Sequence, residues 1–482
     1  MKTYSKYIWI LVGLLIGVGL TGCQDKFPSN VESSDLTVLK SIKILNAGPE
    51  GNQVVEGVVD ENTKRIKFPR ILPESDLKNL KFEATMSDGA QLEKDTYELN
   101  FEEGESEKTI VIKVVNNKRF REYFATVRLI VPVYGAEWSK AKIYDFSANP
   151  MPNDPWPNFK GLVVRGAGFS GKWVAIPARM DAHVISTEEI LKGNDKPEAI
   201  KLNLEGVPGN WKANSTFATH SARVIGEHIY MASLSSKGLP RIYHWVDPKK
   251  APDILMSDEL LKDPNFGYRF GESLGLDLDE QGNGFIFLGV NDAAGMSAFA
   301  RLTVKNWTKV SDPILLTGFP FIKTWSFYNR IEYSDQYLVT SLQDGNIYLA
   351  GEKGDPSVII PKGILPENAG DPRIINFAGE RYLLTLDGAR SANHGTPALR
   401  LYNITKGKTA KEALEIVASE GVIEKLFEHS IGGGPNAAPG ARSGFDIIKD
   451  AEGNDSKLLL FGAVTDSGFA VIEIPKKELI LD

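Results

Sequence analysis

The sequence predicts an all-β protein in which a small immunoglobulin-like β-sandwich precedes a β-propeller. Along residues 36–133, short apolar runs alternate with polar residues, as half-buried strands do. From about residue 139 a different pattern begins, in which a strand, a polar turn and a more apolar strand recur. Recurrence of one strand set is typical of a propeller, whose blades stack around an axis because none can bury both sheet faces alone.

The first region, residues 36–133, holds five strand candidates and shows no helical period. Asn116-Asn117 is expected to form the hairpin turn between the last two strands. About a hundred residues of short strands fit an immunoglobulin-like sandwich. The candidates are SIKIL (41–45), RIKF (65–68), KFEATM (81–86), TIVIKVV (109–115) and EYFATVRLIV (122–131).

The second region, residues 134–482, repeats one hairpin with the same turn chemistry. DLDEQGNGFIFLGV (277–290) and IIKDAEGNDSKLLLFGAV (447–464) each run from a strand through an acidic Gly/Asn turn into four apolar residues and a glycine. Six such units predict a six-bladed propeller, and seven blades stay open because residues 420–440 are unassigned. KIYDFS (142–147) is expected to close the ring by pairing with the last blade. The alternative is a large irregular β-sandwich.

The N-terminus reads as an export signal. Lys2 and Lys6 precede an apolar stretch that is shorter than the ~20 residues of a membrane span. Leu20-Thr21-Gly22-Cys23 closely resembles the bacterial lipobox, which implies a signal peptide over 1–22, acylation of Cys23 and a tether over 23–35. The alternative is an uncleaved anchor. Because Cys23 is the single cysteine, the mature protein has no cysteine for a disulfide.

Composition and motifs exclude several classes of function. The formal net charge of −7 argues against a nucleic-acid partner, because phosphate binding needs a basic surface. The six histidines form no HExxH pair, and neither a nucleophile elbow nor a phosphate-binding loop is present. We therefore expect no metal and no cofactor.

Basic residues recur where the inner strand of each predicted blade begins. Arg223, Arg330 and Arg373 each precede the first apolar residue of their unit, and Glu272 takes this place in the third. We expect them to converge on one rim of the channel as a ligand site, because guanidinium groups bind hydroxyls and carboxylates in pairs and aromatic rings stack on sugars. The further candidates are Lys160, Arg442, Trp325, Tyr328, Arg179, Asp181 and His183.

This site has a purely structural alternative. The arginines would then pair with Glu272, Asp371 and backbone carbonyls and line a filled channel. The aromatic residues would pack between blades.

The order of segments resembles uncharacterised surface lipoproteins of Bacteroidetes. LPESDLKNLKFEATMSDGA (72–90) and REYFATVRLIV (121–131) are similar to an immunoglobulin-like family of unknown function, and residues 134–482 to a propeller family of unknown function. The resemblance implies an outer-membrane lipoprotein, a glycan ligand and an outer-membrane protein partner. Gln24-Asp25-Lys26 is a poor match to surface-export signals, so both the cell surface and the periplasmic face stay open.

The sequence thus predicts a lipid-anchored protein that binds carbohydrate, including acidic polysaccharide, at one propeller face without catalysis. A polysaccharide hydrolase or lyase is the first alternative, and it would need two carboxylates, or a Tyr or His base beside an arginine, in one pocket. A protein-interaction scaffold is the second, and it would expose a broad apolar patch.

Overall fold

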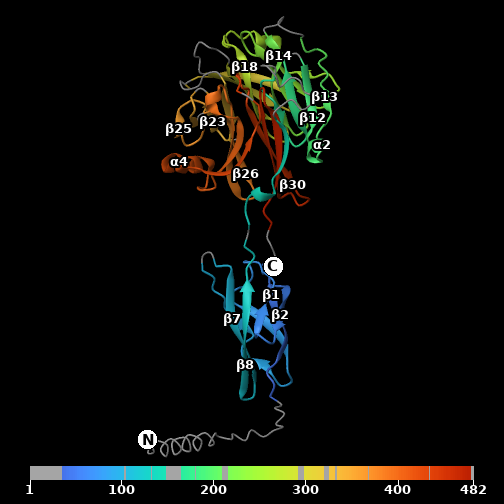
Figure 1. Ribbon diagram of the computed structural model, residues 1–482, viewed down its shortest axis with the longest axis vertical. Coiled ribbons are helices and arrows are strands. Elements are labelled where there is room, and N and C mark those ends of the chain that lie inside the picture. Colours follow the sequence, from blue (N-terminus) through green and yellow to red (C-terminus); the bar gives the residue numbers. More distant parts are fainter. Residues whose placement is uncertain are drawn as a thin grey trace, which may run out of the picture. The chain divides into compact units, whose positions relative to one another are not determined.

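The computed structural model describes residues 35–102, 105–131, 133–147, 164–179, 181–208, 215–290, 298–317, 319, 325–331, 334–342, 344–366, 368–433 and 435–478. These residues form two compact units, of which the second is Val133–Glu478 (Figure 1). The predicted signal peptide, Cys23, Lys160 and all of the predicted tether except Asp35 lie outside the described residues. Within the described ranges, no helix is long and apolar enough to cross a membrane.

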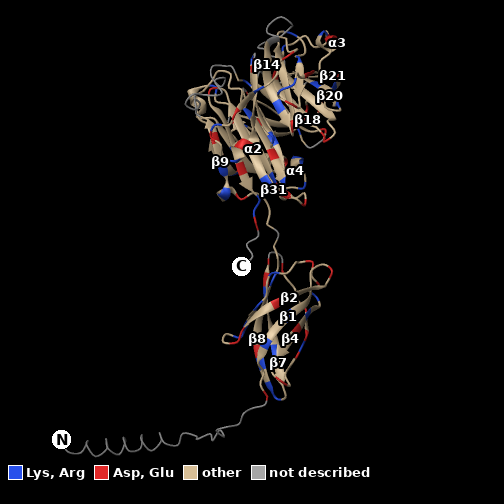
Figure 2. Ribbon diagram, turned by 90° about the vertical axis from the view of Figure 1, so that its right-hand side faces the viewer, with Lys and Arg blue, Asp and Glu red and all other residues tan. Residues whose placement is uncertain are grey.

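The first unit is one eight-stranded sheet with the strand order β5-β7-β8-β3-β2-β1-β4-β6. The predicted hairpin between β7 and β8 is present, but its turn is Asn117-Lys118, one residue later than predicted, because Asn116 still pairs with Arg119. Asn117 has a φ of 51°. Both signs of charge occur along its strands (Figure 2). The strands are β1 (Leu39–Ala47), β2 (Gln53–Asp60), β3 (Arg65–Lys67), β4 (Leu80–Met86), β5 (Gln91–Leu92), β6 (Thr96–Tyr97), β7 (Glu107–Asn116) and β8 (Arg119–Arg128).

The predicted immunoglobulin-like sandwich is wrong, because the strands do not separate into two sheets. β3 pairs in parallel with β8, with Arg65 opposite Phe124, and β1 pairs with both β2 and β4. The hydrogen-bonded ladder is therefore continuous, and the sheet curls into a half-barrel around its own core. Ile44, Phe68 and Tyr123 are fully buried in that core.

The second unit is a six-bladed β-propeller, as predicted, with four strands in each blade. The first three blades are blade one, with β10 (Gly168–Phe169), β11 (Trp173–Ala178), β12 (Asp181–Ser186) and β13 (Ala199–Lys201); blade two, with β14 (Ser215–Ile225), β15 (His228–Ser235), β16 (Ile242–Trp245) and β17 (Asp253–Ile254); and blade three, with β18 (Phe270–Leu278), β19 (Gly284–Val290), β20 (Ala298–Lys305) and β21 (Lys309–Thr317). The last three are blade four, with β22 (Ser326–Arg330), β23 (Tyr337–Ser341), β24 (Ile347–Ala350) and β25 (Pro356–Ile360); blade five, with β26 (Ala369–Phe377), β27 (Glu380–Asp387), β28 (Ala398–Asn403) and β29 (Glu424–Ser430); and blade six, with β30 (Arg442–Lys449), β31 (Asp455–Val464), β32 (Gly468–Pro475) and β9 (Lys142–Ser147).

The ring closes as the sequence predicts. β9 comes from the start of the unit and pairs antiparallel with β32, so the first and last parts of the propeller share the sixth blade. The region that left a seventh blade open supplies β29, the outer strand of the fifth blade. Before it lies α4 (Ala410–Glu420). Its N-cap is Thr409, whose side chain accepts a hydrogen bond from the amide of Glu412, and its C-cap is Gly421 with a φ of 68°.

Equivalent hairpins in different blades share their turn chemistry. Asp279 accepts a hydrogen bond from the amide of Asn283 in the β18–β19 turn, and Asp450 accepts one from the amide of Asn454 in the β30–β31 turn. These local bonds explain the repeated acidic Gly/Asn motif. The remaining helices are α2 (Thr187–Leu191), α3 (Asp258–Leu261), η1 (Trp138–Lys140) and η3 (Ala392–His394).

Candidate functional site

Three inner strands of the propeller are bulged near their beginnings. The register shifts between Phe217 and Ser221 in β14, between Phe270 and Leu274 in β18, and between Gly370 and Arg373 in β26. A bulge breaks the alternation of a strand and redirects a side chain. His220, Glu272 and Asp371 lie within these three bulges, and all are at most 1% exposed.

Two of the bulges depend on unusual backbone conformations. Gly271 has a φ of 106°, and a Cβ there would lie 2.1 Å from the carbonyl oxygen of Ser233, so only glycine fits before Glu272. Asp371 has a φ of 44°, in the left-handed region that aspartate and asparagine tolerate better than most residues. The fold thus accepts backbone strain to bury two carboxylates on the axis.

The Asp371 cluster joins four of the six blades. Arg223 Nη2 donates to both carboxylate oxygens of Asp371, at 3.0 and 3.1 Å, and Asn329 Nδ2 donates to Oδ1 at 2.9 Å. The amide of Ser443 donates to Oδ2 at 2.8 Å, and Arg373 Nη2 lies 3.6 Å from Oδ1. Burial alone would raise the pKa of Asp371, but Arg223, Arg373 and Arg442 outweigh it and hold that pKa below its usual range.

The Glu272 cluster surrounds a second buried carboxylate. Arg165 Nη2 donates to Glu272 Oε1 at 3.1 Å, and Arg442 Nη2 donates to the backbone carbonyl of Glu272 at 2.8 Å. His220 Nε2 lies 3.4 Å from Glu272 Oε2. Burial lowers the pKa of His220, so its ring is neutral at neutral pH, and it lowers the pKa of Arg442 to about 10, so this group stays charged.

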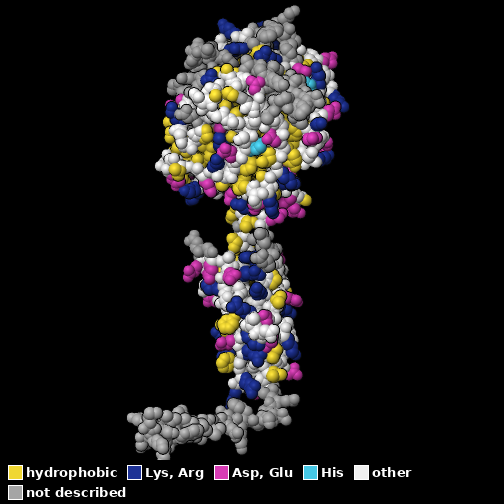
Figure 3. All heavy atoms as spheres, viewed as in Figure 1, with side chains coloured by type: hydrophobic (Ala, Val, Ile, Leu, Met, Phe, Trp, Pro, Cys, Tyr) yellow, Lys and Arg dark blue, Asp and Glu magenta, His cyan; other side chains and the backbone are white. Residues whose placement is uncertain are grey.

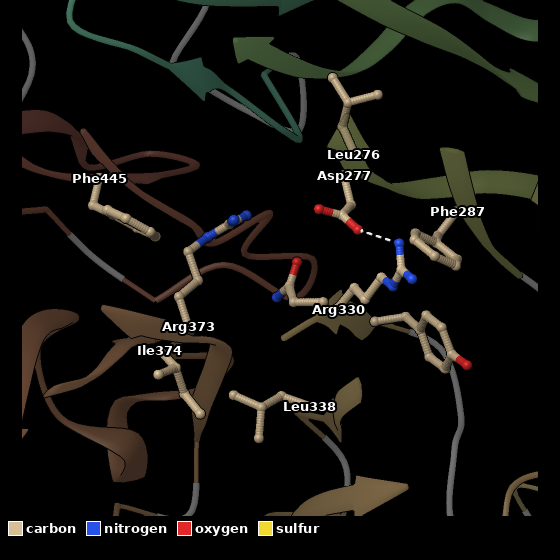
Figure 4. A pocket seen from close by; sticks show the side chains of 10 residues that line it. Leu276, Asp277, Phe287, Arg330, Leu338, Arg373, Ile374 and Phe445 are labelled. Atoms are coloured by element: carbon tan, nitrogen blue, oxygen red, sulfur yellow. Dashed lines mark hydrogen bonds and ion pairs between the residues drawn. The ribbon is translucent and has the colours of Figure 1, made fainter. Parts of the chain in front are cut away.

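A polar pocket of about 260 Å³ opens beside the Asp371 cluster. Figure 4 shows Arg373 reaching into it from one side and the ion pair of Asp277 and Arg330 from the other, with Arg330 Nη1 2.8 Å from Asp277 Oδ2. Burial raises the pKa of Asp277. The rest of the lining is Leu276, Phe287, Tyr328, Asn329, Leu338, Ile374 and Phe445.

The structure brings some of the predicted arginines together and separates others. Arg223, Arg373 and Arg442 meet around Asp371 and Glu272, where Arg223 and Arg442 are 7% and 3% exposed. The structural alternative therefore describes these two, since they are buried in ion pairs and on a backbone carbonyl. Arg330 sits at the end of β22 and pairs with Asp277, and only Arg330 and Arg373 of the four line the pocket.

The other predicted residues lie elsewhere. Asp181 contacts Lys201 at 3.2 Å and lies 4.0 Å from His183 on the third strand of blade one, and none of the three lines the pocket. Arg179 stacks on the Phe217 ring at 4.5 Å, and that ring stacks on His220.

The two predicted aromatic residues have different surroundings. Trp325 stacks with Arg390 at 4.0 Å. Tyr328 lines the pocket but packs in an aromatic cluster with Phe287, Phe299 and Tyr337, as the packing alternative expects.

Sequence reasoning did not select Arg165, His220, Asn329 or Ser443 for the site. A repeated pattern in the sequence could have pointed to Arg165 and Ser443. In VRGAGF (164–169) and in ARSGF (441–445), an arginine precedes a Gly-Phe pair near the beginning of an inner strand. Gly444 allows these two inner strands to pack closely, because a Cβ at position 444 would lie 3.0 Å from the Cβ of Phe169.

The fold and the two buried clusters define a six-bladed β-propeller, preceded by an all-β domain, with ion-paired polar groups between its inner strands. The sequence model of DUF4623, a domain of unknown function, matches residues 25–477, so the chain belongs to the DUF4623 family. A crystal structure of a DUF4623 family protein from Bacteroides eggerthii DSM 20697 is 31% identical, with 92% of this chain and 99% of that chain covered and a TM-score of 0.70.

More distant similarities concern the fold alone. A putative TolB from Agrobacterium tumefaciens is 13% identical over 65% of this chain and 90% of its own, with a TM-score of 0.34. The GH43 protein BlXynB from Bacillus licheniformis is 12% identical over 54% of this chain and 57% of its own, with a TM-score of 0.32. No curated protein matches the chain.

Proposed function

We propose that the propeller binds an acidic carbohydrate in the axial pocket without catalysing a reaction. The observation that carries the proposal is the position of Arg373. Its guanidinium lines the pocket, where its side chain is 18% exposed, and it stands next to a carboxylate that other groups already engage. A uronic-acid carboxylate is the planar anion that such a group binds best.

The hydrogen-bonding balance leaves Arg373 able to take a ligand. Asp371 receives two bonds from Arg223, one from Asn329 and one from the amide of Ser443. Arg373 itself donates through Nε to Ser443 Oγ at 3.2 Å, whereas its Nη2 is 3.6 Å from Asp371, beyond a good hydrogen bond. Burial and then the charge of Arg223 lower the pKa of Arg373 to about 10, and an incoming carboxylate would supply a counter-charge that offsets both effects.

The rest of the pocket suits a sugar unit. Asp277 and Asn329 offer polar atoms for hydroxyl groups, and Phe445 and Ile374 offer apolar surface for the ring faces. A volume of about 260 Å³ is just below the ~300 Å³ at which drug-sized ligand sites begin. We therefore expect one terminal uronate to enter the pocket, with the remaining sugar chain outside it.

The carboxylates present favour binding over hydrolysis. Glycoside hydrolysis normally uses two carboxyl groups that flank the bond. Asp277 is the one carboxylate among the described residues of the pocket lining. Asp371 is fully buried and its pKa is lowered, so it cannot supply a proton at neutral pH. On the face in Figure 3, hydrophobic side chains of the propeller lie in small groups among polar and charged ones, which does not favour the scaffold.

Calorimetric titration with oligogalacturonides tests the proposal. The matched ligand is the same oligosaccharide with methyl-esterified carboxyl groups, which keeps the shape and removes the charge. We expect saturable binding of the acid, at least about tenfold weaker binding of the ester, and a similar loss in Arg373→Ala. Arg330→Ala should weaken binding less, because its charge is shared with Asp277.

Controls decide between the alternatives. Arg119→Ala removes an exposed arginine of the first unit and should leave the affinity unchanged. Each mixture is assayed for new reducing ends and unsaturated products, whose formation would establish an enzyme instead. Equal affinity for acid and ester would contradict the proposal.

We also propose that Cys23 carries a lipid that anchors the protein in the outer membrane, at the cell surface or the periplasmic face. The support is the LTGC segment after an apolar stretch. In growing bacteria, radiolabelled palmitate should enter the wild-type protein and not Cys23→Ser. Label in the variant, or its absence in both, would refute the anchor.

A further inference from the structure

Several buried polar atoms on the propeller axis have no hydrogen-bond partner in the described structure. They are Nε of Arg165, Arg223 and Arg442, both ring nitrogens of His220 and Oγ of Ser221. All five residues are at most 7% exposed, so bulk water does not compensate for the missing bonds. A buried donor without a partner is costly, and native structures contain few of them.

The same region carries more positive than negative charge. Among the described residues of the two clusters, three buried guanidinium groups (Arg165, Arg223 and Arg442) face the two buried carboxylates of Glu272 and Asp371, while Arg373 reaches the pocket. His220 does not change this balance, because burial lowers its pKa and keeps it neutral. Among these buried groups, one cation is thus left without a counter-charge, which is costly in a low-dielectric interior.

The donors without partners concentrate in the Glu272 cluster. Arg165 and Arg442 both bond to Glu272, one to the carboxylate and one to the backbone carbonyl, so their guanidinium groups flank one residue. His220 approaches the same carboxylate, and Ser221 follows it in β14. Gly166, next to Arg165, leaves room for Ser221, since a Cβ at position 166 would lie 2.7 Å from the Cβ of Ser221.

We infer that this cluster holds a resident small monovalent anion of about the size of chloride. Arg165 and Arg442 supply its positive surroundings, and the hydroxyl group of Ser221 supplies a neutral donor. The anion offsets part of the surplus charge and accepts hydrogen bonds from atoms that otherwise lack partners. Because these residues are almost fully buried, it is a structural component of the channel and not the ligand of the pocket. The inference does not rest on the proposed carbohydrate function.

Thermal unfolding of residues 24–482 in chloride tests the inference. Ionic strength is held constant with a bulky sulfonate buffer anion, so that only the supply of small anions changes. Binding to the folded state alone raises Tm with ligand concentration, and we expect roughly 2 °C at a tenfold excess over Kd. A crystal grown in bromide should show an anomalous peak between Arg165 and Arg442.

Two variants shift the chloride dependence in opposite directions. Arg442→Met removes one cation, so Tm should depend less steeply on the chloride concentration. Glu272→Gln removes a carboxylate but keeps an acceptor for Arg165, so Tm should depend more steeply on it. Lys192→Met, at the exposed C-cap of α2, is the surface control and should leave the dependence of Tm on chloride unchanged.

The outcomes are decisive even if Arg442→Met does not fold. A wild-type Tm that ignores chloride, together with no bromide peak, overturns the inference. Equal slopes in the wild type and Glu272→Gln also overturn it, because they would show general screening. Arg373→Ala should lose sugar binding and keep the chloride dependence, so the two proposals fail separately.

Discussion

The two units of the protein differ in whether their charged side chains are buried. In the first unit, no described Asp, Glu, Lys or Arg is buried, and its ion pairs lie at the surface, as Lys113 with Glu93 does at 2.7 Å. In the propeller, Asp371 and Glu272 are at most 1% exposed and are held by arginines from other blades. Surface pairs contribute little to stability, whereas buried ions are costly unless paired. The comparison therefore assigns the buried charged groups, and the candidate site that they form, to the propeller.

Among the proposed substitutions, Asp371→Asn should change the stability of the propeller most. Asparagine tolerates the left-handed backbone at this position, so the substitution removes the charge with little added strain. Three arginines then lose their shared counter-charge, and breaking a buried pair costs about 3–5 kcal/mol. We expect the free energy of unfolding of the propeller to fall by that amount in urea titration, with tryptophan fluorescence as the readout.

The matched variant in the first unit is Glu93→Gln, which breaks the pair with Lys113. That exposed pair is worth at most about 1 kcal/mol, so its loss should barely change the unfolding midpoint of the first unit. Circular dichroism follows this unit, because residues 36–132 contain no tryptophan. Similar losses in the two variants would show that the buried cluster is no more important than a surface pair.

The sequence could predict the propeller because each blade carries its own local signals. The turns at Asp279 and Asp450 are stabilised within five residues, so they repeat visibly along the chain. The closing role of residues 142–147 followed from a strand left without a partner at the start of the unit.

Two features could not be predicted because they depend on contacts distant in sequence. The parallel pairing of β3 with β8 turns the predicted sandwich into one curled sheet, and it joins Arg65 to Phe124, which lie far apart in the sequence. The bulges in β14, β18 and β26 break the alternation from which side-chain direction is inferred. Aligning arginines by position therefore placed Arg330 with Arg223, although the structure pairs them with different carboxylates.

A smaller loss of stability is expected when the pH is lowered from 7.5 to 5.5, and it should affect the propeller but not the first unit. Every histidine lies at or after residue 183, so the first unit contains none. In the propeller, burial lowers the pKa values of His220 and His244. The rings face charged neighbours: Glu272, Arg165 and Arg442 around His220, and Asp253 with His228 around His244.

The sign follows from proton binding. The unfolded state takes up protons as the pH falls through about 6.5, while the folded state resists them, so stability is complete above that pH and declines below it. At pH 5.5 the loss is at most ~1.4 kcal/mol for each buried histidine. Calorimetric scans should show the propeller transition moving down by a few degrees while that of the first unit stays in place. His244→Gln should remove part of this shift, and a decline of equal size in both units would mean that groups other than histidine control it.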